Sequence, residues 1–453
     1  MLTRVLAATQ AGSLRLAARV CGPAAGAGVA ASMATYRKRI GSRPLRSRLE
    51  AVGGTASDAA LGLRANNNLR LVTLDTEAKA SLSSNLLAEL QEHYARWSID
   101  PNVAAVVLQA SPKTNKVFSA GFDLEALAGD KAAAYLAEYF KLAELVSARF
   151  ENHHIALIDG HAALGTFGVS AAGRWSVATE AASLAVDEVR AGLPVTGGAS
   201  YVLARMPFGM GAYMGLTGRR LNGRSLLHAG LATHYLGSDK LPALLDELAT
   251  LTTDAASYER INDVLTFFID NLEGNAAWLE LEKSPEGLAH RRAALDKTLS
   301  GRDGGEPSGA LEWTFGEAPS MEMLVERLSV LNSPWGARML ASLAFCSPLA
   351  LKVSFELIRS AADKTLHEAM RDEYRAAVRL IKSPDFAVGR ESYARVAALG
   401  SLNPASGSVP AKLEPPSWPS GSVADVADAD VTAIINTPLS RGADGASDLV
   451  FKA

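Results

Sequence analysis

Apolar residues between positions 69 and 240 form short runs, separated by segments with helical spacing. The runs are rich in β-branched residues and predict strands at 69–75, 103–109, 155–159 and 175–179. Between the first two runs, one helix face is predicted by the spacing of Leu82, Leu86, Leu90 and Trp97. This strand, helix, strand order with short connections predicts an α/β fold whose sheet is largely parallel and covered by helices.

The pattern changes after residue 240, where the core predicted at 60–240 ends. Residues 241–345 begin with charged, helix-forming sequence and predict a helical insertion, with a glycine-rich loop at 300–309. Residues 346–399 predict C-terminal helices, because Ser347 and Pro348 suit an N-cap and first turn, and Thr365 and Glu368 fit a capping box. The Pro-, Ser- and Gly-rich extension at 400–453 predicts an extended arm, most clearly over 400–422.

The N-terminal 49 residues have a distinct charge pattern. No Asp or Glu precedes Glu50, whereas nine Lys or Arg residues occur among many Ala, Ser and Gly residues. This composition is typical of a mitochondrial transit peptide, and it predicts a mitochondrial matrix protein. The alternative is a basic tail on a cytosolic protein. Part of the segment, 35–48, could stay on the mature chain as a basic arm.

Overall composition excludes several classes of protein. The net charge of -3 offers no molecule-wide attraction for nucleic acid, so any such contact has to be local. A run of about 18 apolar residues, the length of a membrane span, does not occur. Cys21 and Cys346, the two cysteines, are too few for a disulfide framework or a zinc site, and no metal is expected.

Four segments together carry a family resemblance. They are NKVFSAGFDLEAL (115–127), ALIDGHAALGTFGVS (156–170), LAVDEVRAGLPVTGG (184–198) and YMGLTGRRLNGRSLLHAGLATHYL (213–236). They resemble the crotonase (enoyl-CoA hydratase/isomerase) superfamily. The helical insertion and the SPLALKVSFELIR segment are similar to its 3-hydroxyisobutyryl-CoA hydrolase branch. Over residues 60–420 the resemblance implies a crotonase-like ββα spiral with a helical C-terminal region, which holds an acyl-CoA.

The resemblance implies an oxyanion hole made of two backbone N–H groups, those of Phe122 and Gly165, which would polarise a thioester carbonyl. The sequence at each of these two positions differs from the hydrolase motif. Phe122 replaces a preferred glycine, and Leu164, Gly165 and Thr166 replace three glycines. Because a backbone N–H survives a side-chain change, the hole is still expected, but the acyl pocket is expected to be narrowed.

Glu188 stands where the resemblance places a catalytic acid, after Asp187 in place of the usual proline. The alternative for Glu188 is a surface-turn carboxylate without a role. The hydrolases have a second acid about eight residues later, where this chain offers Pro194, Val195 or Thr196. The second acid of the hydratases corresponds to Gly168. Loss of a proton-transfer group typically lowers a rate by roughly 10²–10⁴, so we expect hydrolysis to be impaired.

Several other polar residues are candidates for a functional role, and each also has a purely structural interpretation. His161, in the glycine-rich loop, is a candidate substitute base. His153 and His154 are expected at a strand entry rather than at a metal. Arg219, Arg220 and Arg224 could bind CoA phosphates or RNA phosphates, or could face solvent.

Two functions follow from these changes. A catalytically impaired protein could serve as a structural subunit, and one small-subunit protein of some mitochondrial ribosomes looks like 3-hydroxyisobutyryl-CoA hydrolase. Ribosomal proteins and rRNA would then be the partners. The alternative is an active mitochondrial hydrolase of valine catabolism. In that case the acyl-CoA thioester is the ligand, and no other cofactor is expected in either case.

Overall fold

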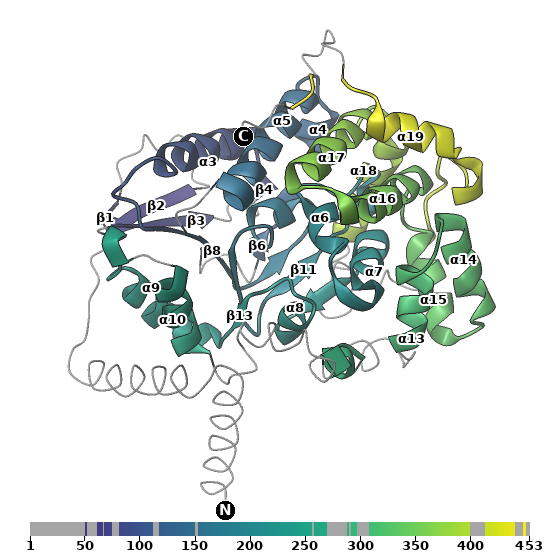
Figure 1. The fold of residues 1–453 in the computed structure, drawn as a ribbon. Helices are drawn as coiled ribbons and strands as arrows, with labels where there is room; N and C mark the ends of the chain where they lie inside the picture. The colour runs from purple at the N-terminus through teal and green to yellow at the C-terminus, as the bar shows by residue number, and fades with distance from the viewer. Residues whose placement is uncertain are drawn as a thin grey trace, which may run out of the picture.

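The computed structural model describes residues 50–51, 61–66, 68–74, 81–111, 117–149, 153–255, 258–269, 288–289, 291–296, 308–398, 413–439 and 447–449. The predicted transit peptide at 1–49, with Cys21, lies outside these residues. The α/β prediction is confirmed (Figure 1).

A seven-stranded sheet forms the larger layer, in the order β1-β2-β3-β5-β8-β10-β13. Its strands are β1 Glu50–Ala51, β2 Leu61–Asn66, β3 Leu69–Leu74, β5 Ala105–Ala110, β8 His154–Ile158, β10 Trp175–Ala178 and β13 His234–Tyr235. β3, β5, β8, β10 and β13 are parallel, whereas β1 and β2 are antiparallel additions at one edge. The parallel part matches the runs of β-branched residues, because strands covered on both faces are apolar throughout.

A smaller, four-stranded sheet follows the order β12-β11-β9-β6, and a two-stranded sheet joins β4 to β7. These strands are β4 Ser81–Leu82, β6 Val117–Ser119, β7 Gly121–Phe122, β9 His161–Ala162, β11 Ser183–Ala185 and β12 Arg220–Asn222. Paired residues of these short strands are 22 to 44 positions apart in the chain, so the two sheets bring separate segments to one place, where the candidate site lies.

Helices cover both faces of the large sheet (Figure 1). The helices within the core region are α3 Ser84–Trp97, α4 Leu124–Ala128, α5 Ala132–Glu144, α6 Ala199–Leu203, α7 Met210–Thr217 and α8 Arg224–His228. Val72, Val106 and Ala156 face the core shared with α3 and α5. Leu71, Val107 and Leu157 face α9 Leu241–Leu248 and α10 Tyr258–Phe268.

The helices described after residue 300 pack beside the smaller sheet. They are α13 Ser308–Leu311, α14 Met321–Val330, α15 Pro334–Leu343, α16 Pro348–Ser360, α17 Leu366–Leu380, α18 Pro384–Ala398 and α19 Asp428–Asn436. The predicted cap at Ser347 and the capping box of Thr365 and Glu368 are confirmed. Among the described residues no single helix is long and apolar enough to cross a membrane. Within the same residues, one pair, Pro334–Leu343 (α15) and Pro348–Asp363 (α16 with the turn after it), reaches that length and apolarity together, and the two are bent by 107°.

Two details differ from the sequence-based expectation. Leu82 lies in β4 and not on the α3 face, because the hydroxyl of Ser83 accepts the N–H of Leu86 at 3.3 Å and begins the helix at Ser84. Of the predicted extended arm, residues 400–412 lie outside the described residues; 413–418 form neither helix nor strand, 419–420 form a turn, and the chain then forms α19, which the composition does not predict. Val431 and Ile435 are buried where α19 packs on α16 and α17, so tertiary packing stabilises this helix.

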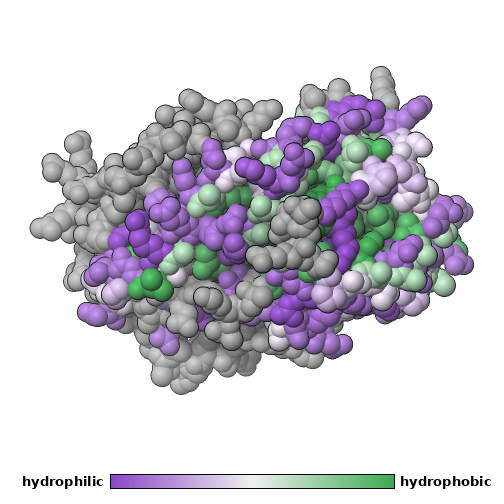
Figure 2. Space-filling view, turned by 90° about the horizontal axis from the view of Figure 1, so that it is seen from above, coloured by the Kyte–Doolittle hydropathy of each residue, from purple (hydrophilic) through white to green (hydrophobic). Residues whose placement is uncertain are grey.

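Figure 2 views the molecule from above, over the side where α17 and α19 lie, and shows hydrophilic and hydrophobic residues interspersed there. We call the described C-terminal residues, 413–439 and 447–449, the C-terminal strap, because they run across α15, α16 and α17.

Candidate functional site

The structure brings the three residues implied by the resemblance together. Phe122 ends β7, Gly165 follows β9 in the glycine-rich loop, and Glu188 begins a 3-10 turn after β11. The N–H of Gly165 donates to Oε1 of Glu188 at 2.9 Å. The Glu188 side chain is buried, with 1% of its surface exposed, so it is not a surface-turn carboxylate.

Both N–H groups of the expected oxyanion hole have partners inside the protein. The N–H of Phe122 donates to the carbonyl of Leu164 at 2.7 Å, and the N–H of Gly165 donates to Glu188. An oxyanion hole acts through donors that point at the position of the developing negative charge. In this arrangement neither donor is available to a thioester oxygen.

The ring of Phe122 closes the space above the loop. A Cβ placed on Gly165 would lie 2.5–2.7 Å from three ring carbons of Phe122, so the ring covers the glycine directly. The ring packs edge-on against Tyr139, with centroids 4.7 Å apart, and Phe122 is 4% exposed. The aromatic ring therefore packs directly on the loop that was expected to supply one oxyanion donor.

Asp187, the residue in place of a proline, fixes the conformation of the loop. Its Oδ1 accepts the N–H of Leu164 at 2.9 Å, and its Oδ2 accepts the hydroxyl of Tyr393 at 3.0 Å. Leu164 has φ +44°, a left-handed conformation that is uncommon for leucine. Two consecutive carboxylates, Asp187 and Glu188, thus bind two consecutive backbone N–H groups. The sequence signal for this arrangement was the Asp-Glu pair itself.

The electrostatics of Glu188 follow from its burial. Burial raises the pKa of Glu188 to about 8, the charge of Asp187 adds to the rise, and the N–H of Gly165 opposes it. Oε2 of Glu188 has no hydrogen-bond partner among the described residues. At pH 7 Glu188 is therefore largely protonated, as a general acid would be.

The position of a second acid is filled by neutral groups. The hydroxyl of Thr196 lies 3.4 Å from Oε1 of Glu188, which selects Thr196 among the three candidate positions. At Gly168, an added Cβ would lie 2.6 Å from the hydroxyl of Tyr139 and 3.0 Å from Cα of Gly197. A carboxylate does not fit at Gly168, so neither two-acid arrangement is formed.

One nearby acid was missed by the sequence reasoning. Glu373 of α17 accepts the N–H groups of Gly198 and Ser200, each at 2.7 Å, and the hydroxyl of Ser200 at 2.6 Å. Burial raises the pKa of Glu373 to about 7. Its oxygens cap the first turn of α6, so Glu373 acts as a structural acid. It is 173 residues from Ser200 in the chain, and no local motif indicates the contact.

The histidine candidates lie on strands of the two sheets. His161 is half-buried in β9, opposite Ser183 of β11. His154 begins β8, as predicted, and its Nε2 lies 3.1 Å from the hydroxyl of Tyr94. Burial lowers the pKa of His154 to about 3, so it is neutral.

The three arginines after α7 do not form one exposed face. Arg219 is buried, and Arg224 stacks on the ring of Tyr235 at 4.9 Å. In the described ranges, no three side chains of His, Cys, Asp or Glu are grouped as a metal site.

Comparisons with known proteins show the family of this chain. A sequence model described as Enoyl-CoA hydratase/isomerase matches residues 69–395. The mitochondrial 3-hydroxyisobutyryl-CoA hydrolase of Xenopus tropicalis is 28% identical over 352 residues, which cover 76% of this chain and 84% of the relative. The small ribosomal subunit protein mS47 of Neurospora crassa is 29% identical over 332 residues, 71% of this chain and 63% of the relative.

Solved structures agree on the fold. A carnitinyl-CoA dehydratase from Mycobacterium thermoresistibile superposes with a TM-score of 0.63 at 23% identity, over 83% of this chain and 96% of that chain. An enoyl-CoA hydratase from Rhodobacter sphaeroides gives 0.62 at 22% identity, over 83% and 97%. These likenesses show the fold alone. By its sequence match and its fold, the chain belongs to the enoyl-CoA hydratase/isomerase (crotonase) family and is similar to 3-hydroxyisobutyryl-CoA hydrolases.

Proposed function

We propose that this chain is a catalytically impaired, hydrolase-like protein that acts as a structural subunit of the small subunit of the mitochondrial ribosome, in the mitochondrial matrix. Ribosomal proteins and rRNA are its partners. The observation that carries the proposal is the internal use of both oxyanion-hole donors, Phe122 N–H by Leu164 and Gly165 N–H by Glu188.

The chemistry of the remaining side chains points the same way. Thioester hydrolysis needs a stabilised oxyanion and a group that activates water. Here Phe122 covers Gly165, and the residue beside Glu188 is Thr196, whose hydroxyl is not a base near pH 7. A family member with this fold and a closed site fits a role in which the protein binds partners through its surface and does not use the pocket. The likeness to a mitochondrial ribosomal protein supports the choice of this assembly.

The second candidate function is hydrolysis of 3-hydroxyisobutyryl-CoA, and one observation favours it. Glu188 keeps a buried carboxyl whose pKa is near 8 and whose Oε2 has no partner among the described residues, as a proton donor in a pocket would. Hydrolysis would require Phe122 and Glu188 to move away from Gly165 when a thioester binds.

Two measurements on the mature protein separate these functions. In the first, steady-state hydrolysis of 3-hydroxyisobutyryl-CoA is compared between the parent chain and Glu188→Gln; we expect indistinguishable rates. Turnover of about one per second that is lost in the variant would establish the hydrolase. In the second, a mitochondrial lysate is separated on a density gradient, and we expect the chain in the small-subunit fractions. Its absence from those fractions would reject the ribosomal role.

A further inference from the structure

Three arginines follow one face of α17. Arg371, Arg375 and Arg379 are spaced four residues apart, and side chains at this spacing are neighbours about 5–6 Å apart on a helix surface. All three are half-buried, and an exposed lysine, Lys382, follows the end of the helix. We call Arg371, Arg375 and Arg379 the arginine stripe.

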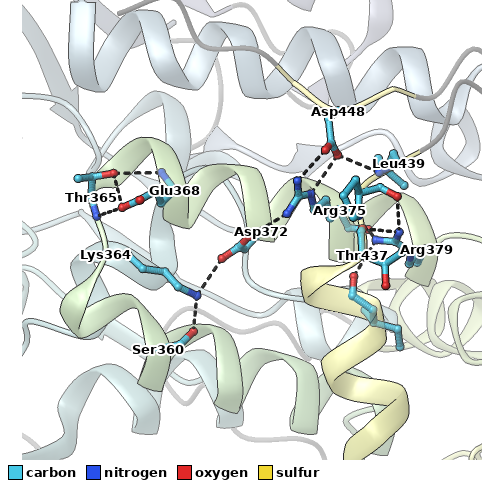
Figure 3. Close-up of polar contacts among 12 residues, drawn as sticks. Ser360, Lys364, Thr365, Glu368, Asp372, Arg375, Arg379, Thr437, Leu439 and Asp448 are labelled. Atoms are coloured by element: carbon cyan, nitrogen blue, oxygen red, sulfur yellow. Dashed lines mark hydrogen bonds and ion pairs between the residues drawn. The ribbon is translucent and has the colours of Figure 1, made fainter.

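The C-terminal strap lies on this stripe through Asp448. Figure 3 shows Asp448 facing Arg375, with Oδ1 accepting from Nε at 3.0 Å and Oδ2 accepting from Nη2 at 2.6 Å. This two-bond pairing is the geometry in which a guanidinium binds either a carboxylate or a phosphate. Asp448 thus occupies a place that a phosphate group also fits.

Arg379 is covered by the end of α19. Its guanidinium donates to the carbonyls of Ile434 at 2.8 Å, Thr437 at 2.6 Å and Pro438 at 3.4 Å, at the negative end of the helix dipole. Figure 3 shows Arg379 beside Thr437. These carbonyls carry partial charges but no formal charge. Burial and, to a smaller extent, the charge of Arg375 lower the pKa of Arg379, and the charge of Asp448 opposes this.

The formal charges do not balance over the stripe. Among the described residues, the strap supplies one carboxylate, Asp448, for three arginines. The acids of α17 beside the stripe are shared. Asp372 lies 2.8 Å from Nζ of Lys364 and 3.6 Å from Nη1 of Arg375. Glu368, whose charge acts on Arg371, accepts the N–H and the hydroxyl of Thr365, each at 2.8 Å. Arg371 makes no hydrogen bond or ion pair within the described part of the chain. The covered face therefore keeps excess positive charge.

We propose that the arginine stripe binds the phosphate backbone of RNA, and that Asp448 and the end of α19 cover it in the free chain. A single-stranded backbone offers one phosphate after another, so it replaces the one carboxylate with several formal charges. The inference rests on the proposed function and deepens it, because it names the surface through which the chain contacts RNA.

The test measures binding of a fluorescent 20-nucleotide polyuridylate to the mature chain by anisotropy at several salt concentrations. Asp448→Asn uncovers the stripe and should bind roughly fivefold more tightly than the parent, the effect of removing one competing ion pair. Asp430→Asn removes the same charge from an exposed site on α19 and should leave the affinity near the parental value. Polyglutamate of matched length should compete weakly, since it lacks phosphates.

Arginine variants in the Asp448→Asn background locate the contact. Arg371→Gln and Arg375→Gln should each lower the slope of log affinity against log salt by about 0.7, the value for one lost phosphate contact on a single strand. Arg359→Gln, an exposed arginine of α16 paired with Glu356, is the matched control and should keep the slope. In the unmodified chain, hydrogen exchange should slow over 371–382 and quicken at Asp448 when RNA is added, which tests the idea without any substitution.

The outcomes are separable from those of the proposed function. Equal affinities for Asp448→Asn and Asp430→Asn, or equal slopes for the stripe and control arginines, would reject the stripe as an RNA site even if the chain sediments with the ribosome. Tighter binding by polyglutamate than by RNA would reject RNA as the occupant. RNA binding at the stripe in a chain that sediments apart from the ribosome would reject only the proposed function.

Discussion

The N–H of Gly165 and Oε1 of Glu188 are joined by a hydrogen bond of 2.9 Å, so the expected acid occupies one of the expected oxyanion donors. Either group alone would fit a catalytic site. Because the two groups are buried and bonded to each other, neither is available to a substrate, which fits a closed pocket. The bond also makes Glu188 part of the core, where its protonation affects stability.

Glu188 should make stability depend on pH. Its pKa is about 8 in the folded chain and near 4.5 when exposed, so the folded state binds more protons between these values. The free energy of unfolding should therefore fall as pH rises from about 4.5 to about 8, by up to about 1.4 kcal/mol per pKa unit of difference. Glu188→Gln removes this part of the fall. Thermal unfolding from pH 5 to pH 8.5 should show the parent losing stability relative to the variant.

Glu373 serves as the control for this measurement. Its pKa of about 7 predicts a similar loss with rising pH, and that loss should remain in Glu188→Gln. Parallel pH profiles for the parent and Glu188→Gln would mean that Glu188 is ionised in the folded chain, contrary to its burial.

Phe122→Ala should destabilise the chain without creating an active site. Removing a buried phenyl ring leaves a cavity and costs about 3–5 kcal/mol of unfolding free energy. Hydrolysis should stay absent, since the N–H of Phe122 still donates to Leu164 and no second acid appears. Chemical denaturation and the thioester assay measure the two effects. Phe122→Leu should cost less, and a gain of turnover in either variant would show that the ring alone blocks catalysis.

Much of the fold was predictable from the sequence, because its signals are local. Runs of β-branched residues placed β3, β5, β8 and β10, and the caps at Ser347 and Thr365 placed two helix starts. The small sheet was not predictable, since β9 and β11 are only two and three residues long and depend on partners far along the chain. The helix α19 was missed because packing on α16 and α17, rather than a local sequence pattern, stabilises it.

The residues of the candidate site were predictable from the sequence, but the hydrogen bonds between them were not. The motifs gave Phe122, Gly165 and Glu188, yet the pairing of Gly165 with Glu188 depends on the loop geometry. That geometry rests on Asp187 and on Tyr393, which is 206 residues further along the chain. Long-range contacts of this kind leave no periodic pattern in a single sequence.

Tyr393→Phe should loosen the loop of the candidate site. The variant removes the hydroxyl that donates to Oδ2 of Asp187 and leaves a buried carboxylate oxygen without that bond. A lost partner of a buried charged group costs about 1–3 kcal/mol. Chemical denaturation should report this loss, and hydrogen exchange at the N–H of Leu164 should quicken. Tyr201→Phe, which changes a more exposed tyrosine, is the control and should have little effect. Unchanged hydrogen exchange at Leu164 would mean that the hydroxyl of Tyr393 does not stabilise the loop.

Lys352 should determine how firmly the C-terminal strap is held. Its Nζ donates to the carbonyl of Val426 at 2.7 Å and lies 2.6 Å from carboxylate oxygens of both Glu322 and Asp428, so one cation joins α14, α16 and α19. Lys352→Met keeps the apolar stem but leaves the two carboxylates facing each other without the cation. The strap should then open more often, and limited proteolysis should cut within 413–439 several-fold faster.

Lys364→Met is a matched control, because Lys364 bonds Ser360 and Asp372 but no described residue of the strap. Equal cleavage of the two variants would mean that the apolar contacts of Val431 and Ile435, rather than the ammonium of Lys352, hold the strap on the helices.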